Sequence, residues 1–309
     1  MAQLLIDTDT ASDDAVALLM AFRHPATVVE AVTVVAGNVP LAQAVQNALY
    51  TREIASSDVP VYAGRAAPRN GVLRTAQFVH GEDGMGDIGL ELSGRTPDEA
   101  DAVEVLIDRI RARPGELTLV TLGPLTNVAE AFERAPDLAG KLARLVMMGG
   151  TSDAIGNISP VAEFNIWVDP EAAGVVFASG APIVMVGWDI SRKYAAFGPA
   201  EAGALSALGP LGRFSVQIQA AVDSFARAHT GLPGFDLPDP IAMAVAIDPQ
   251  TATLTRRLFI DVETAGALTR GQTVIDHLGL TKREPNTDVV FEASRERFDS
   301  LLKLTLTCT

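Results

Sequence analysis

Cysteine is almost absent from this chain of 309 residues, which contains only Cys308. A single cysteine excludes an internal disulfide and a metal site built from several thiolates, and it fits a reducing compartment. No charge-free run of about 18 apolar residues occurs, so a membrane-spanning helix is not expected. The N-terminus also lacks the basic and apolar segments of a signal peptide. These absences predict a cytoplasmic protein with no membrane partner.

Basic residues are also in short supply. The chain has 24 Lys and Arg residues against 38 Asp and Glu residues, a formal net charge of -14. Nucleic-acid binding requires a basic surface, so this balance argues against a nucleic-acid partner and against docking on anionic lipid. Hydrophobic residues make up 48% of the chain, which is enough for a large buried core.

Short apolar runs alternate with helical patterns along the sequence. The runs expected to form strands are 3–6, 28–35, 117–121, 144–148 and 182–187. The segments expected to form helices are 14–22, 41–55 and a stretch from about 125. Continuous Val, Ile and Leu in strands that are followed by helices predict a mainly parallel central sheet with both faces covered. The predicted fold class is therefore α/β.

Two stretches, 63–97 and 227–240, break this rhythm and are expected to be irregular. Long irregular loops in an α/β protein are usually functional or disordered. No internal repeat, linker or sharp change of composition divides the chain. One domain over 1–309 is the simplest interpretation.

Four carboxylates are crowded into residues 7–14, between the first predicted strand and the first predicted helix. Asp13 and Asp14 suit a helix N-terminus, where acidic side chains are favoured. Helix capping does not explain Asp7 and Asp9, whose mutual repulsion at the end of a strand should be costly. The surplus of acids predicts a hard cation that offsets their charge.

This acidic segment resembles the signature Asp-x-Asp-x-Gly-x-Asp-Asp-Ala of the nucleoside hydrolase family, with Ala11 in place of the usual glycine. Other segments that resemble family motifs follow in the expected order: Gly37-Asn38, 119–127, 147–150, 156–171 and Asp239-Pro240. The resemblance spans nearly the whole chain. It implies a Rossmann-like nucleoside hydrolase fold with a mainly parallel sheet flanked by helices.

The resemblance also implies an activity, the calcium-dependent hydrolysis of ribonucleosides to ribose and free base in purine or pyrimidine salvage. Such a reaction passes through an oxocarbenium-like transition state. Ca²⁺ takes six to eight oxygen ligands, so it can hold both ribose hydroxyls and a water. By position in the motifs, the implied metal ligands are Asp9, Asp14, Asp239 and the carbonyl of Leu122. Asp9 would also be the general base.

Further roles follow from the same resemblance. Asp7 would support the metal ligands from behind. The residues implied to bind the ribose or line its pocket are Asp13, Asn38, Asn165 and Met148, with Asn157 and Glu163 at the 5′-hydroxyl. Taken by themselves, Glu163 and Asn165 could equally form an ordinary turn before a helix. Relatives imply a homo-oligomer, a dimer or a tetramer.

One position departs from the family pattern. Many members have a histidine immediately before the late aspartate, as a candidate acid for the leaving base, whereas this chain has Pro238. His80 and His229, one in each irregular stretch, are the candidates to replace it, since histidine titrates near neutral pH. His24 and His277 are expected at the surface. Trp188 could stack on a base, although packing in the core is the more ordinary role of such a residue.

Two other functions compete with nucleoside hydrolysis. Asp7-Thr-Asp9-Thr after a strand resembles the nucleophile motif of haloacid-dehalogenase-like phosphohydrolases, but no later lysine completes that site, and the segment 156–171 would stay unexplained. A riboside-binding protein that has lost catalysis would account for Pro238. It would not account for the retention of Asp9.

Overall fold

The computed structural model describes residues 1–307, and Cys308 lies outside this range. Its centre is a nine-stranded sheet with the order β10-β9-β11-β6-β5-β4-β1-β2-β3. The strands of this sheet are β1 (Ala2–Thr8), β2 (Thr27–Val34), β3 (Val61–Ala63), β4 (Leu117–Thr121), β5 (Arg144–Met148), β6 (Ile183–Val186), β9 (Ala252–Val262), β10 (Thr273–Asp276) and β11 (Thr287–Ala293). Strands β1 to β6 pair in parallel, and β11 pairs in parallel with β6. At the far edge β9 pairs antiparallel with both β11 and β10. The predicted mainly parallel sheet is confirmed.

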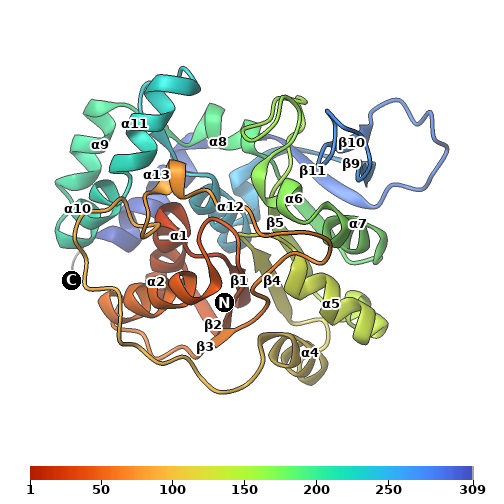
Figure 1. Ribbon diagram of the computed structural model, residues 1–309, viewed down its shortest axis with the longest axis horizontal. Helices are drawn as coiled ribbons and strands as arrows, with labels where there is room; N and C mark the ends of the chain where they lie inside the picture. The colour runs from red at the N-terminus through yellow and green to blue at the C-terminus, as the bar shows by residue number, and fades with distance from the viewer. Residues whose placement is uncertain (308–309) are drawn as a thin grey trace.

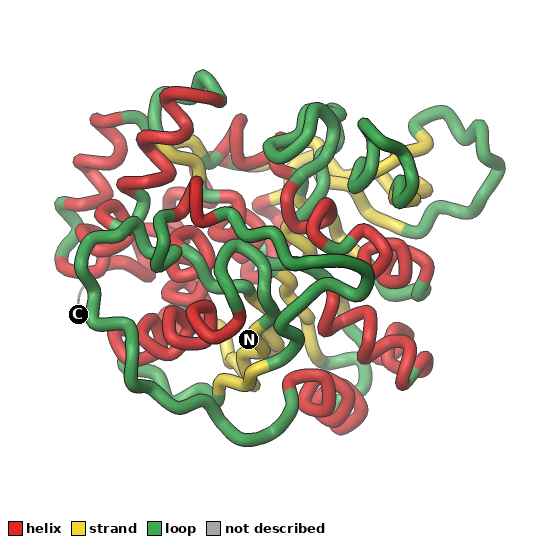
Figure 2. The backbone as a smooth tube through the Cα atoms, viewed as in Figure 1, coloured by secondary structure: helices red, strands yellow, loops and turns green. Residues whose placement is uncertain are grey.

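Helices cover both faces of the sheet (Figures 1 and 2). One face packs against α1 (Ser12–Arg23), α2 (Leu41–Ile54), α12 (Pro238–Ile247) and α13 (Arg295–Leu306). The other face packs against α4 (Ala102–Ala112), α5 (Thr126–Arg134) and α7 (Pro170–Ala178). Successive residues of β1 alternate between the two cores: Leu4 and Ile6 belong to one, and Leu5 to the other. Continuous apolar strands are required because both faces are buried.

Shorter elements surround one end of the sheet. They are α3 (Gln77–His80), α6 (Phe164–Val168), α8 (Trp188–Tyr194), α9 (Pro199–Ser206), α10 (Pro210–Gln217), α11 (Ala220–His229), the 3₁₀ turns Pro136–Lys141 and Pro249–Thr251, and a two-stranded ribbon of β7 (Ala196–Phe197) and β8 (Phe235–Asp236). Several of these elements lie beside the carboxyl ends of the parallel strands, where ligands bind in folds of this class. No helix among residues 1–307 combines the length and apolarity that a membrane crossing requires.

The two irregular stretches turn out differently. Residues 63–97 form a long connection that contains little regular structure besides α3, as expected. The expectation was wrong at both ends of 227–240. Helix α11 continues to His229 because Val222 and Ala226, one turn apart, are buried on its inner side. Pro238 occupies the first turn of α12, where a missing N–H and a fixed φ are favourable.

Asp169 joins three separate segments in the interior beside the second core. Its Oδ1 atom accepts a hydrogen bond from the backbone N of Ala172 and caps α7 at 3.1 Å. Its Oδ2 atom accepts from the backbone N of Arg69 at 2.9 Å and from the hydroxyl of Thr126 at 2.7 Å. This fully buried carboxylate therefore attaches the long 63–97 connection to α5 and α7.

We expect Asp169→Ala to lower the free energy of unfolding by roughly 3 kcal/mol, because it removes a helix cap and also leaves buried donors without an acceptor. Ser294→Ala is the matched control. Ser294 caps α13 with a single hydrogen bond at a half-buried position, so its loss should cost about 1 kcal/mol. Urea unfolding of both variants measures the difference. Equal losses would contradict the role of Asp169 in joining the segments.

Candidate active site

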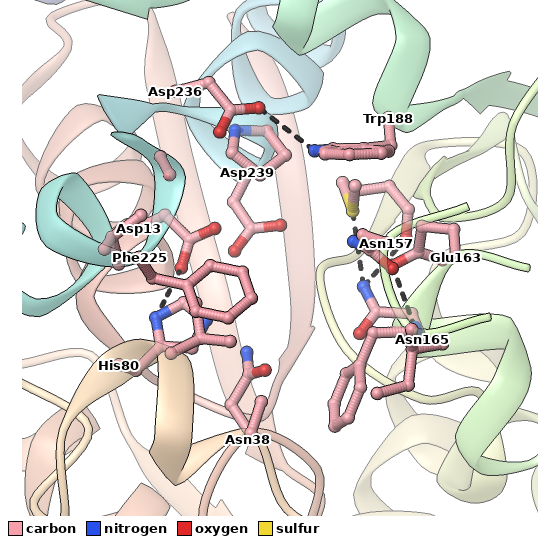
Figure 3. Close-up of a pocket in the computed structure, with 18 of the residues that line it drawn as sticks. Asp13, Asn38, His80, Asn157, Glu163, Asn165, Trp188, Phe225, Asp236 and Asp239 are labelled. Carbon is pink, nitrogen blue, oxygen red and sulfur yellow. Dashed lines mark hydrogen bonds and ion pairs between the residues drawn. The ribbon is translucent and has the colours of Figure 1, made fainter. Parts of the chain in front are cut away.

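A pocket that opens to solvent lies at the carboxyl edge of the sheet, with about 750 Å³ of empty space when the open solvent at its mouth is included. Figure 3 shows two groups of side chains that face each other across it, Asp13, Asn38, His80 and Asp239 on one side and Asn157, Glu163, Asn165 and Trp188 on the other. Leu122 and Met148 also line it. The structure therefore brings together, in a single pocket, residues that the sequence motifs placed far apart along the chain.

Acidic side chains form the floor of this pocket. Asp13 and Asp239 line the pocket and are nearly buried, whereas Asp9 and Asp14 are completely buried beneath them and do not line it. Carboxylate oxygens of Asp13, Asp14 and Asp239 lie within 4.8 Å of one another. Burial and the neighbouring carboxylates raise the pKa of Asp14 to about 7 and those of Asp9 and Asp239 well above the usual value. Such crowding is unfavourable unless a cation or protons offset the charge.

Hydrogen bonds occupy both oxygens of Asp14 but only one oxygen of Asp9. The backbone N of Asn38 donates to Asp9 Oδ2 at 2.6 Å. The backbone N of Ala11 donates to Asp14 Oδ2 at 2.9 Å, and the hydroxyl of Thr8 donates to Asp14 Oδ1. Asp9 Oδ1 and Asp13 Oδ1 are buried and accept no hydrogen bond from residues 1–307. Buried oxygens left in this state are suitable cation ligands.

Two glycines make room for Asp9. A Cβ atom on Gly37 would lie 2.1 Å from Asp9 Oδ2, and one on Gly123 would lie 2.7 Å from Asp9 Oδ1. The carbonyl of Leu122, next to Gly123, accepts a hydrogen bond from Asn165 Nδ2 at 2.8 Å and keeps a second lone pair for another partner. The atoms available to bind a metal here are all oxygens, so the residues fit a hard cation such as Ca²⁺.

Asp7 lies behind this floor, as the motifs implied. Its Oδ1 atom accepts hydrogen bonds from the hydroxyl of Thr33 at 2.6 Å and from Asn127 Nδ2 at 2.8 Å. Burial raises the pKa of Asp7 to about 7. Sequence reasoning had not assigned a role to Asn127, although it belongs to a motif segment, because only the folded chain shows that α5 returns it to the end of β1.

Glu163 and Asn165 form the opposite wall through a helix cap. Glu163 precedes α6 and accepts hydrogen bonds from the backbone N of Asn165 at 2.8 Å and of Gly150 at 2.7 Å. Asn165 Nδ2 also approaches the carbonyl of Met148 at 3.2 Å. Burial raises the pKa of Glu163 to about 7. The residues that cap α6 therefore also form this wall of the pocket. Asn157, in an exposed loop, continues the wall.

The two candidate histidines do not share the pocket. His80, at the end of α3, is buried and lines it, and burial lowers its pKa. His229 is exposed at the end of α11, where its ring lies 4.6 Å from that of Phe225 and does not contribute to the pocket lining. Only His80 is positioned to contact a molecule bound in the pocket.

Asp236 is a pocket residue that sequence reasoning missed. It is buried in β8, where its Oδ2 atom accepts hydrogen bonds from Trp188 Nε1 at 3.1 Å and from the hydroxyl of Ser191 at 2.6 Å. Burial raises the pKa of Asp236 to about 6. An aspartate two residues before Pro238 gives no signal in the sequence, since acids are common in loops. Trp188 is both buried and part of the pocket wall.

An apolar wall completes the pocket. Phe78 from α3 and Phe225 from α11 meet edge to face, with ring centroids 5.7 Å apart. Val79, Val222 and Ala226 continue the same surface. Phe78 is 60% exposed, although it is a large aromatic residue. The pocket therefore has a polar floor suited to hydroxyl groups and an apolar side suited to a flat ring.

Comparisons with known proteins agree with this geometry. A family described as inosine-uridine preferring nucleoside hydrolase matches residues 4–300. The pyrimidine-specific ribonucleoside hydrolase RihA of Salmonella typhimurium is 37% identical over 304 residues, which cover 97% of this chain and 96% of the relative.

Solved structures are also similar. The plant nucleoside hydrolase PpNRh1 superposes with a TM-score of 0.91 and is 34% identical, with 100% of this chain and 99% of that chain covered. The purine-preferring ribonucleoside hydrolase from Gardnerella vaginalis superposes with a TM-score of 0.90 and is 30% identical, with 98% of each chain covered. The phosphohydrolase alternative has no support among these likenesses.

If the buried carboxylates hold a hard cation, Gly37→Ala should weaken the binding of Ca²⁺ at least tenfold, because the added Cβ atom displaces Asp9. Gly174→Ala is the matched control. Gly174 lies within α7, where nothing surrounds an added Cβ atom, and alanine should stabilise the helix slightly. Calorimetric titration of each variant with CaCl₂ measures the affinity, and thermal melting reports on the fold. An unchanged affinity in Gly37→Ala would show that Asp9 tolerates displacement.

Proposed function

This chain belongs to the inosine-uridine preferring nucleoside hydrolase family, and from that membership we propose a calcium-dependent mechanism for its reaction. The enzyme is an N-glycosyl hydrolase that acts on ribonucleosides, as its relatives are. The proposal concerns the identity of the metal, the roles of individual residues and the group that protonates or stabilises the leaving base. The observation that carries it is the cluster of buried carboxylates at the base of the pocket, in which Asp13, Asp14 and Asp239 lie close together and Asp9 Oδ1 and Asp13 Oδ1 have no partner among residues 1–307.

Asp9, Asp14, Asp239 and the carbonyl of Leu122 are the proposed calcium ligands. They come from the end of β1, the first turn of α1, the first turn of α12 and the end of β4. When bound, the cation would orient the ribose diol and acidify water. The oxygen-only donor set and the space that the glycines leave at Asp9 support this assignment.

Asp9 is the proposed general base. Its Oδ2 atom is fixed by the backbone N of Asn38, whereas Oδ1 is free to accept the proton of the attacking water. The surrounding carboxylates also favour positive charge, and positive charge develops on the ribose as the glycosidic bond breaks. The acidic floor thus supplies the base that activates water and also stabilises the positive charge of the transition state.

Polar side chains around the floor match the hydroxyls of ribose. Asp13, Asn38 and Asn165 are proposed to bind the ring hydroxyls, and Asn157 and Glu163 the 5′-hydroxyl. Because the pocket rather than a flat surface presents these groups, they can orient the sugar and exclude water at the same time. Met148 provides an apolar contact beside them.

The leaving base would lie against the apolar wall. His80 and Asp236 are the titratable groups of the pocket outside its acidic floor and the Glu163 cap, and Pro238 offers no proton. We therefore assign the leaving-group help to His80, with Asp236 as a second candidate. His229 is exposed, so we do not propose it as the acid for the leaving base. The named relatives include pyrimidine-specific and purine-preferring enzymes, so likeness alone does not decide the preferred base.

The alternative of a riboside-binding protein without catalysis has no support among the named relatives, which are hydrolases, and a turnover assay tests it directly. A homodimer or homotetramer and a cytoplasmic role in purine or pyrimidine salvage complete the proposal. The proposed cytoplasmic salvage role is consistent with the acidic composition and with a small-molecule substrate.

We expect reducing-sugar release from a panel of purine and pyrimidine ribosides, loss of this activity with a chelator, and its recovery with CaCl₂. Asp9→Asn should lower turnover by roughly a hundred- to ten-thousandfold while the fold persists, because the base is lost. Chelator-resistant turnover would refute the metal requirement. Binding of a riboside without any turnover would favour the competing hypothesis.

We expect His80→Ala to lower kcat/KM more for uridine than for an activated aryl riboside, because an activated leaving group needs no proton. Asp236→Asn gives the same comparison, since it keeps the shape of the side chain while removing the acid. His277→Ala, at an exposed site, is the control. If both substrates lose the same factor in His80→Ala, the histidine acts by positioning or packing instead.

A further inference from the structure

His80 is connected to the start of α11 through the hydroxyl of Ser12. Its Nδ1 atom lies 3.0 Å from Ser12 Oγ, which in turn lies 3.0 Å from Gln219 Oε1. All three residues are buried, and they come from α3, α1 and the residue that precedes α11. A chain of hydrogen bonds thus joins three segments that are distant in the sequence, directly behind the imidazole that lines the pocket.

The orientation of the Gln219 amide is determined by its second contact. Gln219 Nε2 lies 2.9 Å from the backbone carbonyl of Ser12, which can only accept a hydrogen bond. The amide nitrogen must therefore face that carbonyl, and Oε1 must face Ser12 Oγ. Gln219 Oε1 has no other donor among residues 1–307. The Ser12 hydroxyl consequently donates its only proton to Gln219.

With its proton directed at Gln219, Ser12 Oγ can only accept a hydrogen bond from His80. The proton of the neutral imidazole must then be on Nδ1. Asp13 Oδ1, 3.8 Å from the same nitrogen, favours a proton there as well. We propose that Gln219, acting through Ser12, fixes His80 in the Nδ1–H tautomer and so reserves Nε2 for the molecule bound in the pocket.

The opposite tautomer would leave a buried polar group without a partner. Ser12 would have to donate to His80 Nδ1, and Gln219 Oε1 would then face only oxygen lone pairs. An unsatisfied buried acceptor is unfavourable. With the proton on Nδ1, the His80 Nδ1, Ser12 and Gln219 side-chain groups of this hydrogen-bond chain all have partners. Figure 3 shows the line from His80 to Asp13 on one edge of the ring, with the other ring nitrogen on the side of the pocket.

This tautomer sets what His80 can do, and its catalytic meaning rests on the proposed function. As a neutral ring, His80 presents an acceptor at Nε2 and binds an O–H or N–H group of the riboside. As an imidazolium, it donates from the same atom. Ser12 accepts from Nδ1–H in both states, so a proton can be exchanged at Nε2 without rearrangement of the ring. Gln219 and Ser12 are therefore positioning residues.

Long-range proton–nitrogen NMR of the full chain labelled with ¹⁵N-histidine tests the tautomer, with His80→Ala to assign the signal. At a pH where His80 is neutral, we expect a pyrrole-type shift at Nδ1 and a pyridine-type shift at Nε2. In Gln219→Leu the Ser12 hydroxyl is free to donate to Nδ1. The ratio of tautomers should then move by roughly fivefold toward Nε2–H, the effect of one ordinary hydrogen bond, and kcat/KM should fall.

Gln217→Leu is the matched control, because Gln217 is an exposed glutamine at the end of α10. It should keep the wild-type spectrum and activity, and Ser12→Thr, which keeps the hydroxyl, should keep the tautomer. Wild-type His80 with its proton on Nε2 overturns the proposal, and so does folded Gln219→Leu with an unchanged ratio. If Gln219→Leu does not fold, the wild-type spectrum still decides. Absence of riboside turnover in the wild type would count against the proposed function instead.

Discussion

Electrostatic repulsion among buried carboxylates is the constraint on which the rest of this structure depends. Asp9, Asp14 and Asp239 lie out of contact with solvent at one place, where burial and their neighbours raise the pKa of each group. Asp14 caps α1 through the backbone N of Ala11, but hydrophobic packing gains nothing from crowding the other carboxylates beside it. A fold that keeps it must have rigid elements on several sides, and the parallel sheet supplies them, because β1 and β4 end at the same edge and α1 and α12 begin there.

The same arrangement links stability to binding. A cation that binds the folded carboxylates and not the unfolded chain stabilises the protein by mass action. The backbone N–H groups of Ala11 and Asn38 provide only part of this compensation, since Asp9 Oδ1 and Asp13 Oδ1 remain without partners in the described chain. The buried carboxylates consequently lower the stability of the folded chain when no cation is bound, as expected where catalysis requires charge in a buried position.

The sequence predicted the sheet and the floor of the site for a physical reason. Continuous Val, Ile and Leu runs have few alternatives to buried parallel strands, and the acids of 7–14 exceed what helix capping explains. Asp236 and Gln219 could not be found in this way, because their roles depend on contacts with Trp188, Ser191 and Ser12, which only the tertiary fold creates. A sequence motif identifies groups that bind a ligand directly, and it carries little information on groups that orient them.

His80 shows why that distinction matters for chemistry. Its place in an irregular stretch made it a candidate for the pocket, yet the sequence gives no information on which nitrogen carries the proton. That property belongs to Gln219, whose amide is oriented by a backbone carbonyl of α1. Because α1 also carries Asp13 and Asp14, its N-terminus positions two of the buried carboxylates and contributes to the hydrogen-bonding state of the histidine beside them. Displacement of α1 would therefore alter both functions at once, and the core that holds α1 in place acts directly on the chemistry of the site.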